Sequence, residues 1–67
     1  MLLWSEKKKK VYLQMCKLAE KYLTTENGTY RDKLMDLGCK HEIYACEDEE
    51  GILIEDEKFY WHWYQEG

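Results

Sequence analysis

The 67-residue chain has no proline and only four glycines, and neither residue is concentrated in any segment. This composition excludes a proline-rich or glycine-rich linker, so the sequence predicts a single small domain over residues 1–67. The three cysteines are an odd number, which favours free thiols in a reducing cytoplasm over a disulfide framework. The apolar stretch at residues 1–4 is too short for a signal peptide or a membrane span, and we expect no membrane association.

Aromatic side chains take the place of many aliphatic ones. A domain of this length buries only about 60% of the surface of its unfolded chain, so its core has to be efficient. The chain has three Trp, six Tyr and one Phe. These residues can form an efficient core, because an aromatic side chain buries on the order of 150–250 Å². We therefore expect an aromatic core that needs no disulfide.

Charge is unevenly distributed along the chain, whose net charge is −4. Residues 1–46 carry nine basic and six acidic side chains, whereas residues 47–67 carry one basic and eight acidic side chains. The acidic final third disfavours nucleic-acid binding by that part, and the lysines at positions 7–10 leave a basic contact open at the other end. Solvated faces that keep a small protein soluble would explain the same charges.

A first helix is expected between Ser5, a suitable N-cap, and about Thr24, ahead of the stop signal Asn27-Gly28. Its apolar side chains recur at intervals of three and four residues, which is typical of a helix packed on a core. These side chains are Val11, Tyr12, Met15, Cys16, Leu18, Ala19, Tyr22 and Leu23. The opposite face is mainly basic and holds Lys10, Gln14, Lys17 and Lys21.

A second, shorter helix is expected from Thr29, which is placed to form a capping box with Asp32, to Gly38 as the C′ residue. Its inner face would be formed by three apolar side chains, Tyr30, Leu34 and Leu37. Its outer charges cancel, which argues against a DNA-recognition helix, because such a helix carries net positive charge for phosphate contacts.

After Gly38 the pattern alternates with a period of two, which predicts strands at about residues 41–47, 51–55 and 58–65. Short acidic connections favour antiparallel neighbours, so we expect an α+β fold of two helices packed on one face of a three-stranded antiparallel meander. The inner face of the sheet would hold Ile43, Ala45, Ile52, Ile54, Phe59, Trp61 and Trp63. Successive turns of a meander lie at opposite ends, so the two acidic turns should be separate.

The last expected strand has two different faces. Its outward side chains, which alternate with the tryptophans, are candidate partner-binding residues: Tyr60, His62 and Tyr64. The acidic turns add four candidates that would steer association, namely Glu49, Glu50, Asp56 and Glu57. Alternatively, the first helix or the apolar residues at positions 2–4 cover this face and make it a second small core.

Neither a metal site nor an active site is expected. Four residues have the thiolate or imidazole chemistry that zinc prefers, namely Cys39, His41, Cys46 and His62. Their spacing lacks the usual two-residue gap between ligands, and a strand would point Cys46 away from His41. The acidic run at residues 47–50 lacks the alternating order of a calcium loop. With no oxyanion-loop signature and no glycine-rich phosphate cradle, the sequence predicts no metal, no cofactor and no enzymatic activity.

The sequence thus favours a non-enzymatic protein-binding module that acts through the aromatic strand face and the acidic turns. In size and composition the chain resembles small phage and mobile-element proteins that bind and inhibit a host protein, a resemblance that covers no specific residues. A nucleic-acid-binding domain that uses the lysines of the first helix is the less favoured alternative. A homodimer that joins the basic helix of one subunit to the acidic turns of another is the third.

Overall fold

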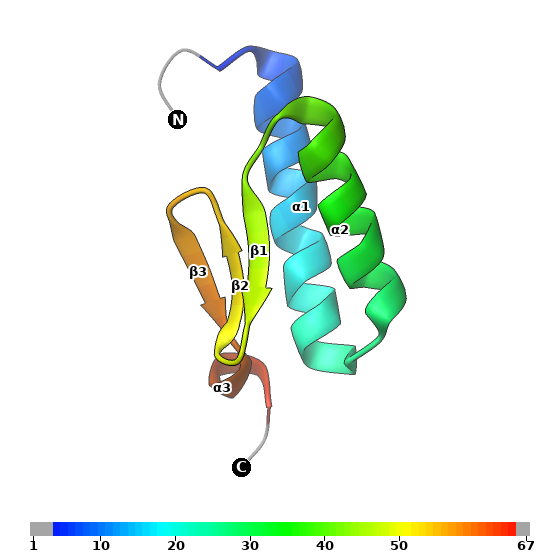
Figure 1. Ribbon diagram of the computed structural model, residues 1–67, viewed down its shortest axis with the longest axis vertical. Coiled ribbons are helices and arrows are strands. Elements are labelled where there is room, and N and C mark those ends of the chain that lie inside the picture. Colours follow the sequence, from blue (N-terminus) through cyan, green and yellow to red (C-terminus); the bar gives the residue numbers. More distant parts are fainter. Residues whose placement is uncertain (1–3, 66–67) are drawn as a thin grey trace.

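Two long helices and a three-stranded antiparallel sheet form the α+β fold that the sequence predicts (Figure 1). This computed structural model describes residues 4–65. In chain order the elements are α1 (Glu6–Thr25), α2 (Gly28–His41), β1 (Ala45–Asp48), β2 (Gly51–Ile54), β3 (Glu57–Tyr60) and the single-turn α3 (Trp61–Tyr64). None of the helices within residues 4–65 has the length and apolar character needed to cross a membrane.

The two ends of α1 follow from local capping. The Ser5 hydroxyl accepts a hydrogen bond from the Lys8 N–H at 3.2 Å, which confirms Ser5 as the N-cap. At the other end Glu26 takes a left-handed conformation, and its N–H donates to the Tyr22 carbonyl at 2.7 Å. The helix ends at Thr25, close to the predicted end, and the predicted apolar stripe faces the core.

Both predicted ends of α2 are wrong. Asn27 replaces Thr29 as the N-cap, since the Asn27 side-chain oxygen accepts a hydrogen bond from the Thr29 N–H at 2.9 Å. Gly38 does not end the helix, which continues to His41. Gly38 instead permits close packing, because a Cβ at this position would lie 2.7 Å from the Ile43 carbonyl oxygen.

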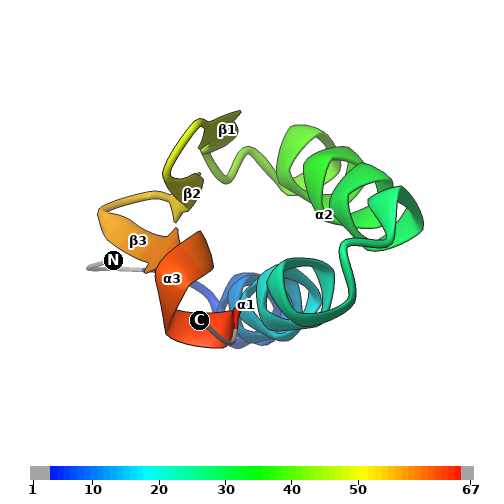
Figure 2. The ribbon, with the colours of Figure 1, turned by 90° about the horizontal axis from the view of Figure 1, so that it is seen from below.

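The strands form a meander in the order β1-β2-β3, and both long helices cover the same face of it (Figure 2). The register pairs Glu47 with Ile52 and Ile52 with Phe59, so these three side chains share the face toward the helices. Each strand has four residues and is shorter than predicted. The first strand starts at Ala45, well after the predicted residue 41, because α2 continues to His41 and residues 42–44 connect it to the strand.

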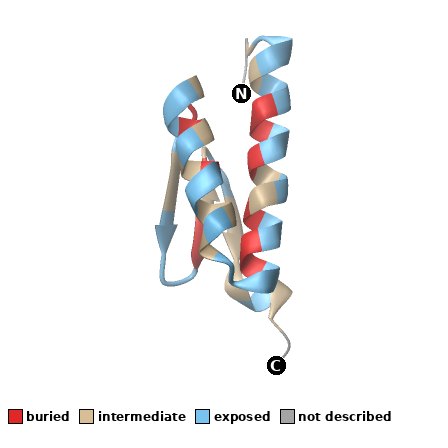
Figure 3. Cartoon of the chain, turned by 90° about the vertical axis from the view of Figure 1, so that its right-hand side faces the viewer, coloured by how far each residue is buried: buried red, intermediate tan, exposed pale blue. Residues whose placement is uncertain are grey.

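The core lies between α1, α2 and this inner face of the sheet (Figure 3). Its fully buried large side chains come from both helices and from the central strand: Met15, Leu23, Leu34, Ile52 and Ile54. Ile43 is also buried, and Ala45, Phe59 and Trp61 pack against the core while partly buried. The predicted inner-face residues are therefore confirmed except for Trp63, which is exposed. The expectation that aromatic side chains form the centre of the core is wrong, because within residues 4–65 the fully buried large side chains are aliphatic or Met and the buried aromatic ones are Tyr12 and Tyr22.

The opposite face of the sheet, here called the outer face, has no helix over it within residues 4–65. The predicted alternative, in which the first helix covers this face, is wrong because α1 packs on the inner face. Trp4 packs on Tyr12 of α1, with ring centroids 5.5 Å apart. Leu2 and Leu3, the other residues suggested as a cover, lie outside the described residues.

Candidate functional site

The chain turns into α3 after Tyr60, where the sequence predicted a strand that continues to residue 65. The Trp61 N–H still donates to the Glu50 carbonyl at 2.8 Å, which extends the pairing of β3 with β2 by one contact. Beyond it the backbone closes a helical turn, since the Gln65 N–H donates to the Trp61 carbonyl at 3.0 Å. The Gln65 side-chain amide donates to the Leu23 carbonyl, which joins this turn to the end of α1.

Helical spacing in α3 replaces the predicted period of two and brings Trp61 and Tyr64 to the same, inward side. The Trp61 ring packs on Tyr22 of α1 with ring centroids 5.1 Å apart. Tyr64 also packs against the core, and burial raises the pKa of its hydroxyl. The prediction that Tyr64 points outward on a strand beside Tyr60 is therefore wrong.

The other two side chains of α3, His62 and Trp63, are exposed and contact Tyr60. The Tyr60 ring centroid lies 5.4 Å from that of His62 and 5.0 Å from that of Trp63. We call these three residues, Tyr60, His62 and Trp63, the aromatic cluster. Trp63 is 57% exposed, so its predicted place in the core is wrong and it belongs to the surface.

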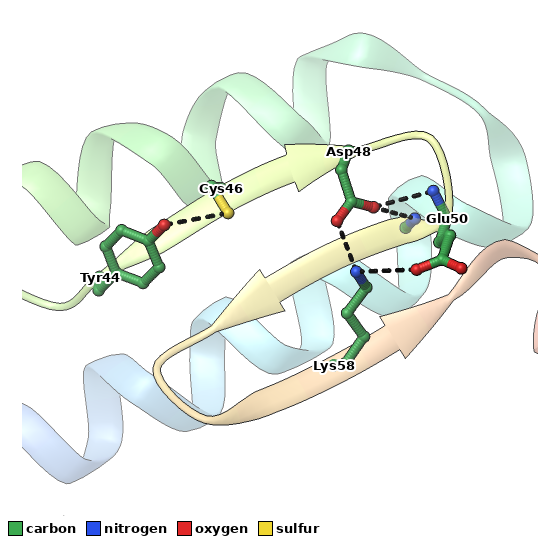
Figure 4. A network of polar contacts seen from close by, with 6 residues as sticks. Tyr44, Cys46, Asp48, Glu50 and Lys58 are labelled. Atoms are coloured by element: carbon green, nitrogen blue, oxygen red, sulfur yellow. Dashed lines mark hydrogen bonds and ion pairs between the residues drawn. The ribbon is translucent and has the colours of Figure 1, made fainter.

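Tyr60 also belongs to the outer face of the sheet. The register places Cys46, Leu53 and Lys58 side by side across the three strands, and Tyr60 lies two residues further along β3 on the same face. Tyr44, just before β1, is 58% exposed, and its hydroxyl donates a hydrogen bond to the Cys46 sulfur at 3.3 Å (Figure 4). An uncovered, partly aromatic surface thus runs from Tyr44 to the aromatic cluster.

Lys58 connects this surface to the acidic turn between β1 and β2 (Figure 4). Its ammonium nitrogen lies 2.5 Å from a carboxylate oxygen of Asp48 and 3.4 Å from one of Glu50. The same nitrogen lies 5.6 Å from the Tyr60 ring centroid, within the range of a cation–π contact. The hydrogen bond between Lys58 and Asp48 lowers the pKa of the Asp48 carboxyl and raises the pKa of the Lys58 ammonium.

Asp48 also fixes the shape of this turn. Its carboxylate accepts hydrogen bonds from the N–H groups of Glu50 at 2.8 Å and Gly51 at 3.1 Å, so the side chain replaces backbone partners within the turn. Glu49, at the tip, is exposed and has no ion pair within residues 4–65. The turn therefore presents one free carboxylate beside two that share Lys58.

The four predicted acidic candidates divide between opposite ends of the sheet. Glu49 and Glu50 lie in the β1–β2 turn, at the end where α3 begins (Figure 1). Asp56 and Glu57 are exposed at the β2–β3 turn, where they approach α1. There burial raises the pKa of Tyr12 to about 12, with smaller contributions that include these two carboxylates. Only Glu49 and Glu50 adjoin the aromatic cluster.

The four residues with zinc-binding chemistry are spread over three elements. Cys39 and His41 belong to α2, Cys46 lies on the outer face of β1, and His62 lies in α3. Within residues 4–65 no three His, Cys, Asp or Glu side chains gather in a way that could hold a metal ion. The third thiol, Cys16, is partly buried in α1, and burial raises its pKa.

Sequence reasoning missed three residues that shape this site, Trp63, Lys58 and Asp48. The spacing of Trp61 and Tyr64 by three residues was a signal for a helical turn that exposes Trp63, but the same residues also fit alternation. Comparison with protein-family models, with curated proteins and with solved structures finds no match to this chain.

Proposed function

We propose that this protein is a non-enzymatic binding module that docks a protein partner on the aromatic cluster and the adjoining outer face. The observation that supports this most is Trp63, which is 57% exposed and yet held by ring contacts with Tyr60 and His62. Trp and Tyr are enriched in interface hot spots, where large rings contribute much of the binding free energy. A ring already ordered on the free protein loses little side-chain entropy when a partner covers it.

The outer face extends this contact beyond a single ring. Tyr44, 58% exposed, lies at the other end of the face, and the partly buried Cys46 and Leu53 lie between it and the aromatic cluster. Tyrosine offers apolar area together with a hydroxyl that can form a hydrogen bond with a partner. Aromatic side chains are enriched at protein interfaces, and the ammonium group of Lys58, which lies beside Leu53 on this face, is already paired with Asp48 and Glu50.

The charge beside the cluster favours a partner with a basic surface. Glu49 has a free carboxylate, and the shared pairs with Lys58 leave the turn with a net negative charge. Exposed charges at the rim of an interface mainly accelerate encounter, while buried rings slow dissociation. A module of this kind would inhibit a partner by covering its surface, without any catalytic group of its own.

Affinity capture with two matched variants tests the proposal. The tagged protein, Trp63→Ser and Leu13→Ser are each incubated with a nuclease-treated lysate of the source organism, and the captured proteins are identified by mass spectrometry. Leu13 is the control because it is 59% exposed, as Trp63 is, but lies on α1 and away from the outer face. Circular dichroism melts establish that both variants fold.

We expect a protein that both the unmodified chain and Leu13→Ser capture and that Trp63→Ser loses. With that partner purified, Trp63→Ser should weaken binding by about tenfold or more, which corresponds to about 1.4 kcal/mol. A partner that Leu13→Ser loses while Trp63→Ser keeps it would contradict the proposed surface. A parallel capture from lysate without nuclease completes the test: if the chain captures proteins only when nuclease is omitted, its interactions depend on nucleic acid, which would contradict the proposed function.

A further inference from the structure

The exposed side of α1 carries a stripe of positive charge, with the neutral Gln14 between Lys10 and Lys17. Four exposed lysines follow each other at helical intervals along one side of the helix: Lys7, Lys10, Lys17 and Lys21. At 1.5 Å per residue the stripe is about 21 Å long. The buried residues of α1 point the other way, into the core, so the stripe faces solvent (Figure 3).

The adjacent helix extends this stripe into a face. The Lys21 ammonium nitrogen lies 5.7 Å from the ring centroid of Tyr30, so the stripe borders the seam between α1 and α2. The side of α2 on which Tyr30 lies also holds, at intervals of three and four residues, Lys33, Leu37 and Lys40. Leu37 packs partly buried against the core, whereas Lys33 and Lys40 are exposed. The charges of α2 nearly cancel when they are summed over the whole helix, but these two lysines lie together on one side of it.

We call these six lysines the two-helix basic face: Lys7, Lys10, Lys17, Lys21, Lys33 and Lys40. None of them forms an ion pair within residues 4–65, where only Arg31 and Lys58 among the basic side chains do so. Asp36 flanks the face on α2, while the acidic turns belong to the sheet on the other side of the core. The face therefore presents six lysines without ion pairs, with the exposed carboxylates of Glu6 and Glu20 at its margin on α1.

We propose that the two-helix basic face binds the phosphate backbone of a nucleic acid without reading its sequence. Unpaired lysines along about 21 Å suit a ligand whose negative charges repeat along a line, as the phosphates of a nucleic acid do. Each phosphate that a lysine neutralises releases condensed counterions, and this release favours binding. The six positions are all lysines, and the face adds no arginine and a single amide, Gln14, with which to read base edges in the manner of a recognition helix. This second surface is independent of the proposed protein-binding function of the outer face.

Two other polyanionic occupants fit less well. An acidic protein would need aromatic anchors, and Leu13 is the exposed large apolar side chain of α1. An anionic membrane favours helices that insert an apolar face, but the apolar side of α1 is already buried, with Met15 and Ala19 fully inaccessible. A nucleic acid requires neither of these features.

Fluorescence anisotropy with labelled duplex DNA and single-stranded RNA of random sequence tests the proposal. We expect binding at about 50 mM salt and, for about five phosphate contacts to duplex DNA, a loss of about 500-fold in affinity by about 200 mM. Lys17→Glu and Lys33→Glu should each weaken binding at least about fivefold at the lower salt concentration and flatten the salt dependence. Lys9→Glu is the matched control, since it changes the net charge equally but lies about 100° round α1 from Lys10. Charges are only partly screened at this salt concentration, so Lys9→Glu should weaken binding by a smaller factor than Lys17→Glu.

Several outcomes would overturn the proposal. One is no binding of either nucleic acid at low salt. Another is an equal loss with Lys9→Glu and Lys17→Glu, which would show that net charge alone matters. A third is an undiminished affinity in Lys33→Glu, which would remove α2 from the face. Equal or tighter binding of polyglutamate, or of vesicles rich in anionic lipid, would assign the face to an acidic protein or to a membrane.

Discussion

Replacing each of the two tryptophans of α3 by alanine tests which way that turn faces. Trp61 is partly buried against Tyr22, whereas Trp63 is 57% exposed. Truncation of a buried tryptophan costs about 3–5 kcal/mol, and because Trp61 keeps part of its surface in water we expect about 2–3 kcal/mol for Trp61→Ala. Trp63→Ala removes an exposed ring and should change the free energy of unfolding by about 0.5 kcal/mol or less.

Urea unfolding followed by far-ultraviolet circular dichroism measures both variants without using the fluorescence of the rings that are removed. A loss of 2–3 kcal/mol is large for so small a domain, so the contrast between the variants should appear directly in the unfolding midpoints. A strand that continued through residue 65 would bury both rings on one face and predict similar losses. Equal losses, or a larger loss for Trp63→Ala, would refute the helical turn.

Three further predictions address packing, pH and charge. Gly38→Ala should lower the free energy of unfolding by about 1–3 kcal/mol, since its Cβ would meet the Ile43 carbonyl oxygen. Gly28→Ala is the control and should be neutral or stabilising, since its Cβ would meet only the Arg31 side chain at an ordinary contact distance of 3.7 Å; equal effects of the two substitutions in urea unfolding would contradict the close contact at Gly38. Burial raises the pKa of Tyr12 from 10.0 to about 12, so its contribution to stability is complete below pH 10 and is lost as the pH rises toward about 12. Thermal melts should therefore show a smaller alkaline loss for Tyr12→Phe than for the unmodified chain, and identical losses would exclude this role. With a basic partner in hand, Glu49→Lys should slow association and weaken its salt dependence while leaving dissociation nearly unchanged; a change confined to dissociation would place Glu49 inside the contact instead.

The helical core was predictable because local signals and tertiary packing agree there. Apolar residues repeat through α1 with helical spacing, and Met15 and Leu23 are fully buried as that spacing implies. The ends of α2 were not predictable, because two caps competed and Asn27 formed the better turn. Gly38 was misjudged for a related reason, since its role is the close approach of the chain at Ile43, a contact that its own neighbours in sequence do not reveal.

The candidate site was only half predictable. Tyr60 lies on the outer face as its alternation with Phe59 implies, and Glu50 adjoins it across the β1–β2 turn. The residues after Tyr60 are nearly all aromatic and satisfy both a period of two and a helical turn. Tertiary contacts decide between them: Trp61 packs on Tyr22, and the Gln65 side chain bonds to α1, about forty residues away in sequence. A local pattern contains no information on such contacts.

The most direct test of the proposed function observes the tryptophan indole N–H signals by nuclear magnetic resonance as the captured protein partner is added to the isotope-labelled chain. Trp61 and Trp63 lie in the same turn, one packed inward and one exposed, so each serves as the control for the other. We predict that the Trp63 indole signal and the backbone signals of Tyr60 and Tyr44 shift or broaden, while the Leu13 backbone signal stays unchanged. Changes confined to α1 and α2, with the Trp63 indole unaffected at saturation, would contradict the outer face as the protein-binding surface.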